Sequence, residues 1–133
     1  MGEYLHSESK ELAYGTGSGT QDLARADASG FKSLLAVGEG VVSGGGFRVN
    51  FYDSAAGGTA TPATANDLIG IGNKTVSNTG QVSTTETTAP IRLGIIPRKR
   101  YVQLTFVAPG GSGSEEAWLI GMDAVQQPVE DQI

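Results

Sequence analysis

The stretch from Ala89 to Val125 constrains the fold more than any other part of the chain, because it contains three strand-forming segments in succession. In the middle segment, Val102, Leu104 and Phe106 alternate with more polar neighbours. That period of two is typical of a strand with one buried face. The predicted strands cover residues 91–96, 101–108 and 117–124.

The last of these segments is apolar at most positions. Trp118, Ile120 and Met122 share one face of it, and we expect that face to lie in the core. Pro97 ends the first segment, and the glycine-rich residues 109–114 form a loop after the second. We therefore expect a meander, in which the three strands are neighbours and supply half of the core.

Short strand-forming segments recur through the rest of the chain. Phe47, Val49 and Phe51 repeat the same alternation. The further candidates cover residues 12–14, 31–42, 47–53, 67–77 and 81–88. About eight short strands favour an all-β fold, a two-sheet antiparallel sandwich with jelly-roll topology.

The length of 133 residues predicts one domain over residues 1–133. Residues 1–13 are expected to form an extended N-terminal arm that leads into the first strand. Residues 126–133, which contain Pro128 and two acids, are expected to form a tail. The long polar loop over residues 54–66 is of a kind that often carries function.

Composition excludes several classes of protein. A net charge of −5 argues against a nucleic-acid-binding surface, which needs an excess of Lys and Arg. The chain has no cysteine, which removes disulfides and thiolate metal sites. No stretch is long and apolar enough to predict a membrane span, and the N-terminus shows no signal peptide.

The residues for enzymatic chemistry are scarce. The only histidine, His6, lies in the expected arm, so a histidine-based triad or zinc site is not predicted. The glycines do not form a nucleotide-binding motif. The acids that remain lie beside loop signals and are expected to be solvated: Asp22, Asp27, Asp53, Glu115 and Glu116. We therefore expect no catalytic residues, no metal and no cofactor.

The run Arg98-Lys99-Arg100 concentrates positive charge in an acidic chain. One interpretation is a charged turn that keeps a sheet edge soluble. The other is an electrostatic contact with an acidic partner, for which the acids of an adjacent copy are candidates: Glu115, Glu116, Glu130 and Asp131. Tyr52 and Tyr101 fall on the outer faces of their strands, and tyrosine is enriched at interfaces. The candidate subunit or capsid interface is thus Arg98, Lys99, Arg100, Tyr101 and Tyr52.

The C-terminal half resembles small jelly-roll cement, or decoration, proteins of tailed-phage capsids. The motifs that carry the resemblance are Ile96-Pro97, Arg100-Tyr101, the alternating strand 102–107, the glycine-rich loop 110–113 and the apolar strand 117–122. Residues 15–23 and 48–57 fit more loosely, so about half of the chain is covered. The extended arm and the acidic tail depart from the family pattern.

The resemblance implies a homotrimer on the outer surface of the virion's capsid. There it would bind the phage major capsid protein and lock neighbouring capsomers together. It implies no catalytic residues and so no enzymatic activity. From the net charge and the short apolar runs, we expect neither nucleic acid nor a membrane as a partner. A weak contact at each subunit would suffice, because three linked contacts gain avidity.

Two other interpretations stay open. One is a different phage structural β-domain, such as a tail or head–tail connector component. The other is a carbohydrate-binding β-sandwich, which would present aromatic side chains in a groove. Tyr52, Tyr101 or Trp118 would have to serve there.

Overall fold

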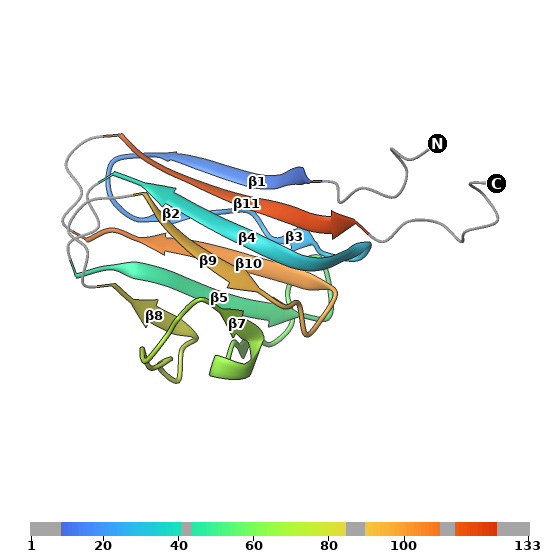
Figure 1. Cartoon of the computed structure of the whole chain (residues 1–133). Helices are drawn as coiled ribbons and strands as arrows, with labels where there is room; N and C mark the ends of the chain where they lie inside the picture. Colours follow the sequence, from blue (N-terminus) through green and yellow to red (C-terminus); the bar gives the residue numbers. More distant parts are fainter. Residues whose placement is uncertain (1–8, 41–43, 85–89, 110–113, 125–133) are drawn as a thin grey trace.

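The structure, a computed structural model, describes residues 9–40, 44–84, 90–109 and 114–124. In these residues, two antiparallel β-sheets face one another (Figure 1). The first sheet has five strands, in the order β1 (Lys10–Gly17), β11 (Glu115–Ala124), β4 (Phe31–Glu39), β9 (Ile91–Ile95) and β7 (Leu68–Ile69).

The second sheet has six strands in the described part of the chain. Its centre is β10 (Tyr101–Val107) paired with β5 (Gly46–Tyr52). Short strands flank this pair: β2 (Gln21–Asp22) and β3 (Ala26–Asp27) beside β10, and β6 (Thr61–Pro62) and β8 (Gln81–Ser83) beside β5. A single 3-10 turn, η2 (Ala65–Asp67), is the one helical element among the described residues.

The strand order is that of a jelly roll, which confirms the predicted all-β sandwich. The predicted meander is wrong, because successive strands cross between the sheets. Both β9 and β11 pair with β4 in the five-stranded sheet, whereas β10 pairs with β5 in the other. Alternation shows that a strand has one buried face, but it does not say which strand lies beside it.

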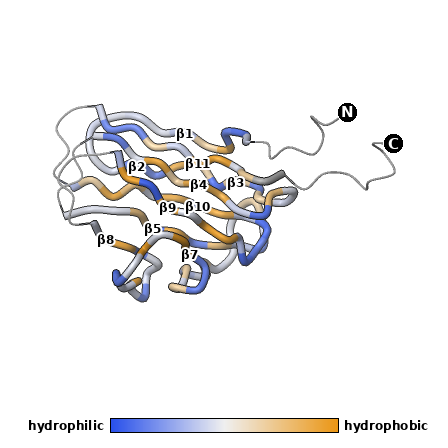
Figure 2. The backbone as a smooth tube through the Cα atoms, in the orientation of Figure 1, coloured by the Kyte–Doolittle hydropathy of each residue, from blue (hydrophilic) through white to orange (hydrophobic). Residues whose placement is uncertain are grey.

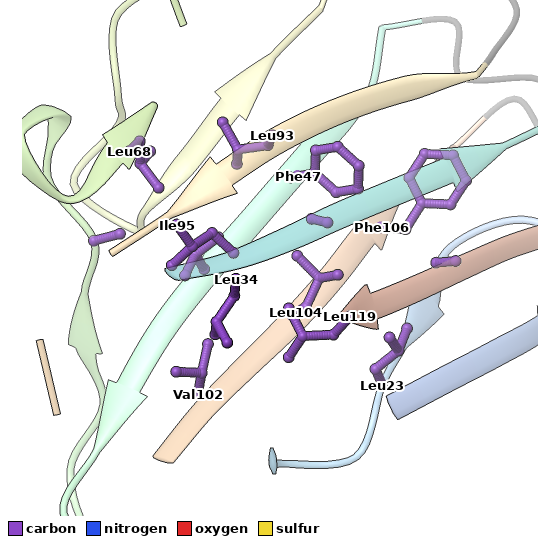
Figure 3. Close-up of a cluster of buried hydrophobic side chains, with 14 of the residues drawn as sticks. Leu23, Leu34, Phe47, Leu68, Leu93, Ile95, Val102, Leu104, Phe106 and Leu119 are labelled. Carbon is purple, nitrogen blue, oxygen red and sulfur yellow. The ribbon is translucent and has the colours of Figure 1, made fainter. Parts of the chain in front are cut away.

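The core lies between the sheets. Val102, Leu104 and Phe106 are fully buried, which confirms their predicted inward face. Phe47, Val49 and Phe51 of β5 are buried in the same way, and the Phe47 and Phe106 rings lie 5.6 Å apart, centroid to centroid. Figure 3 shows how leucines of the five-stranded sheet complete the cluster, among them Leu34, Leu93 and Leu119.

The predicted inward face of β11 is wrong. Ala117, Leu119 and Gly121 face the core, so that Trp118, Ile120 and Met122 lie on the outer face, half-buried. Both faces of this strand are apolar in sequence, and steric fit decides between them. A side chain added at Gly121 would meet the Phe31 ring at 2.7 Å. The small residues face inward because a bulky ring already occupies the space opposite them.

Several predicted boundaries also shift. Strand β1 begins at Lys10 and pairs with β11. Residues 10–13 therefore belong to the sheet and not to an arm. Of the strand predicted over residues 67–77, only Leu68–Ile69 forms a strand, which is β7. Residues 1–8 and 126–133, the rest of the expected arm and tail, lie outside the described residues. No helix among the described residues is long and apolar enough to cross a membrane.

Candidate functional site

The basic turn, defined as Arg98, Lys99 and Arg100, joins β9 to β10. Each of its three cations forms an ion pair with a different acid of the same chain. Arg98 pairs with Asp67, Lys99 Nζ lies 3.0 Å from Asp53 Oδ2, and Arg100 Nη2 lies 2.8 Å from Asp27 Oδ2. The turn is therefore tied to three separate segments rather than left as a free positive patch.

The pair at Asp67 is the most buried of the three. The Asp67 carboxylate caps η2, since Oδ2 accepts hydrogen bonds from the Thr64 backbone N–H at 2.9 Å and from its hydroxyl at 3.1 Å. Burial disfavours the carboxylate, but the hydrogen bonds from Arg98 and Thr64 together outweigh it and hold the pKa of Asp67 below its usual value. Arg98 therefore fixes the 3-10 turn against the start of β10.

The pair at Asp27 is more exposed. Hydrogen bonds from the Arg100 guanidinium, with a further one from the Ser29 backbone N–H, hold the pKa of Asp27 far below its usual range. The Ala28 N–H donates to the Arg100 carbonyl at 2.7 Å. Side chain and backbone thus bind β3 to the basic turn.

The two predicted tyrosines lie side by side on the outer face of the six-stranded sheet, where Tyr101 pairs in register with Tyr52. The Arg100 guanidinium carbon is 5.2 Å from the Tyr101 ring centroid, and that of Arg25 is 3.4 Å from the Tyr52 centroid. Arg25 also donates to the carbonyl oxygens of Ser54 and Gly57, both at 2.8 Å. Two guanidinium groups thereby stack on two aromatic rings, and that of Arg25 also holds the loop that follows β5.

The fold therefore brings together all five predicted interface residues, at one end of the six-stranded sheet. It adds Arg25 and three acids that sequence reasoning did not place there. Those acids lie 31, 46 and 73 positions from their partners, so no local spacing signals the pairs. The pairing supports the simpler interpretation of the turn as structural, while a contact with another copy stays a prediction. Of the acids proposed as partners in such a copy, Glu130 and Asp131 lie outside the described residues.

The other candidate acids also have specific contacts. Glu115 is buried, contrary to its prediction as a solvated loop acid, and its Oε1 accepts the Gly19 N–H at 2.7 Å. Asp22 accepts the Thr105 hydroxyl at 2.8 Å, and Glu116 accepts the Tyr14 hydroxyl at 2.5 Å. Among the described residues, no three acids or histidines gather as metal ligands would.

A cavity of about 260 Å³ opens between β5, β8 and β9, away from the basic turn. Phe47, Val82 and Leu93 are among its apolar lining residues, and Lys74 and Arg92 also line it. The described lining contains no carboxylate, thiol or imidazole, so it offers no acid–base pair.

No protein-family profile matches the chain, and no curated protein matches it in sequence. Among solved structures, the fold is similar to the crystal structure of SPBc2 prophage-derived protein YomS, with a TM-score of 0.53. The match covers 88% of this chain and 95% of that chain, at 12% sequence identity. At that identity the likeness concerns the fold, and the chain thus has the sandwich fold of a protein that a prophage encodes.

Proposed function

We propose that this chain is a non-enzymatic structural protein of a phage particle, a cement protein that binds the outer capsid surface as a homotrimer. Its partner is the major capsid protein, and its role is to hold neighbouring capsomers together. The resemblance of the C-terminal half to cement proteins and the fold shared with a prophage-derived protein both support this proposal.

The observation that carries the proposal is the preorganised surface at the end of the six-stranded sheet. Tyr52 and Tyr101 are held by stacked guanidinium groups, and the basic turn is held by ion pairs to the same domain. Side chains already fixed before binding lose little conformational entropy on docking, which favours a rigid protein surface as partner. Tyrosine and arginine are the residues expected at the centre of such contacts.

The test is occupancy of expanded capsids that lack cement protein, measured by co-sedimentation. Lys99→Glu suits this test, because its partner Asp53 is 83% exposed and the domain does not depend on the pair. Lys74→Glu is the matched control, with the same change of charge at an exposed loop position. We expect Lys99→Glu and Tyr101→Ser to lower occupancy and Lys74→Glu to leave it unchanged. A wild-type chain that does not bind such capsids would refute the proposal.

One observation favours a second function, carbohydrate binding. The outer face of the six-stranded sheet places Tyr52 and Tyr101 beside Asn50 and Gln103 in adjacent register pairs. Aromatic rings next to amide groups are a combination that can stack on and hydrogen-bond to a sugar. On this alternative, Tyr101→Ala abolishes binding to a glycan array, while capsid occupancy is unaffected.

A further inference from the structure

The outer face of the five-stranded sheet is apolar, although the described structure places nothing against it. Its apolar side chains come from β1, β11, β4 and β7: Tyr14, Trp118, Ile120, Met122, Leu35, Val37 and Ile69. We call these residues the Trp118 face. Tyr14 is 43% exposed and Ile69 is 50% exposed, and the Tyr14 and Trp118 rings lie 5.4 Å apart.

The opposite outer face of the sandwich shows how unusual this is. On β10 and β5 the outward positions are mostly polar: Gln103, Thr105, Arg48 and Asn50, with Tyr52 and Tyr101 at one end. An antiparallel sheet with one solvated face normally alternates apolar inward and polar outward residues. The six-stranded sheet follows that rule, whereas β4 contains successive hydrophobic residues (Figure 2), and most outward positions in the middle of β4 and β11 are apolar. A sheet apolar on both sides is expected to be covered on both sides.

We propose that the Trp118 face is where copies of this chain bind one another. This rests on the proposed function for the expectation that copies assemble, but it moves the contact between copies away from the basic turn. The cations of the basic turn already have partners within the chain. The Trp118 face combines exposed and half-buried apolar side chains, and it includes Tyr, Trp and Met, which are enriched at protein interfaces.

The size of the face is sufficient for such a contact. Strand β11 has ten residues, and at about 3.4 Å per residue it extends about 34 Å. The five strands of the sheet contain 34 residues, and with strands about 4.8 Å apart each residue covers about 16 Å². The outer face therefore covers about 550 Å² on each copy, or about 1,100 Å² in the contact, which clears the roughly 1,000 Å² expected of a biological interface.

The charged residues at the edge of the Trp118 face favour a second copy of this chain over a partner whose surface carries charges of only one sign. Glu39 and Glu116 lie directly opposite each other in register, an unfavourable placement of like charges. Arg92 lies at the β9 side of the same face, in register with Val37, and forms no ion pair with a described residue. Around the three-fold axis of a trimer the contact is heterologous, so Arg92 of one copy can meet Glu39 or Glu116 of the next copy.

The test uses the full chain without capsids, so that it is independent of the proposed function. Trp118 is the only tryptophan, and its emission therefore reports on this face alone. We expect light scattering to show an oligomer, and Trp118 emission to shift to longer wavelength on dilution as the oligomer dissociates. Leu35→Glu, at the centre of the face, is expected to weaken association by about thirtyfold or more, as loss of an interface hot spot does.

Two further variants guard against misfolding as an explanation. Arg92→Glu changes an exposed rim residue and is expected to weaken association with an unchanged circular dichroism spectrum. Asn50→Glu is the matched control, since it adds a negative charge to the outer face of the other sheet, and it is expected to leave the mass at the wild-type value.

Three results would overturn the inference. The first is a wild-type chain that is monomeric at every concentration with solvent-exposed Trp118 emission. The second is a monomer whose Trp118 emission is shielded, because then residues 1–8 or 125–133 of the same chain cover the face. The third is a Leu35→Glu chain, folded as judged by circular dichroism, that keeps the wild-type mass. An oligomer that Leu35→Glu dissociates but that never binds capsids would refute the proposed function alone.

Discussion

The inner face of β4 contains a glycine that is covered by a buried aromatic ring, and a methyl group added there tests how closely the two sheets pack. A Cβ atom at Gly38 would lie 2.6, 2.8 and 2.9 Å from three carbon atoms of the Phe106 ring. Carbon atoms in good contact are about 3.5–4.0 Å apart, so the ring or the strand must move by roughly 1 Å.

The ring has little room for that movement. Phe106 is fully buried and packs against Phe47. Overpacking of this kind costs about 2 kcal/mol. Replacing glycine also lowers the entropy of the unfolded chain, which returns about 0.5 kcal/mol. We therefore expect Gly38→Ala to reduce the free energy of unfolding by about 1.5 kcal/mol, or to lower Tm by about 6 °C for a domain of this size.

The measurement is urea unfolding followed by circular dichroism. Gly15→Ala is the matched control, because Gly15 also lies in a strand of the same sheet with ordinary backbone angles. Its nearest neighbour would be the flexible tip of Leu23 at 3.1 Å. We expect this control to change stability by about 0.5 kcal/mol or less.

A double-mutant cycle completes the test. Phe106→Leu removes the ring that the new methyl group meets, so Gly38→Ala should be at least about 1 kcal/mol less destabilising in that background. Equal losses for Gly38→Ala in both backgrounds, or equal stability of the Gly38→Ala and Gly15→Ala chains, would refute the packing argument.

Three further predictions follow from the polar contacts. Because Arg100 holds the pKa of Asp27 down, the pair's contribution is complete above about pH 4 and is lost as the pH falls toward the folded-state pKa. When the urea concentration at the unfolding midpoint is plotted against pH, Asp27→Asn should therefore reduce the fall of the midpoint at acid pH. Glu115→Ala should cost about 1–3 kcal/mol of unfolding free energy, because the Gly19 N–H loses a buried acceptor. Arg25→Ala should speed hydrogen exchange and proteolysis within residues 54–58, with little change in the global unfolding midpoint.

Each of these three has a result that would contradict it. An acid limb unchanged by Asp27→Asn would show that the pair has no net effect on stability. A Glu115→Ala chain as stable as the wild type would mean that water replaces the carboxylate without loss. Unchanged exchange in the loop after Arg25→Ala would mean that contacts other than the two carbonyl hydrogen bonds hold it.

At the candidate interface, the sequence predicts the direction of the tyrosine side chains but not the ion-pair partners of the basic turn. The outward direction of Tyr52 and Tyr101 followed from alternation alone, and both side chains are where it placed them. The partners of the basic turn could not be read in the same way. Asp27, Asp53 and Asp67 approach Arg100, Lys99 and Arg98 only because β3, the end of β5 and η2 all meet the basic turn in the folded chain.

Local sequence pattern is enough to predict that the chain forms short strands and that β10 and β5 bury one face each. Period-two alternation is a local property, and it survives whatever the strand pairs with. It also determined the number of layers, since half-apolar strands must bury their apolar faces against one another.

Which strands are neighbours, and which face of β11 is buried, depends on packing between distant parts of the chain. Successive strands alternate between sheets, so the pairing depends on contacts far apart in the chain. For β11, both faces satisfy the hydrophobic pattern, and the choice comes from volume. Gly121 leaves room for the Phe31 ring, and Ala117 and Leu119 fill the rest of the inward side, so that Trp118, Ile120 and Met122 lie on the outer face.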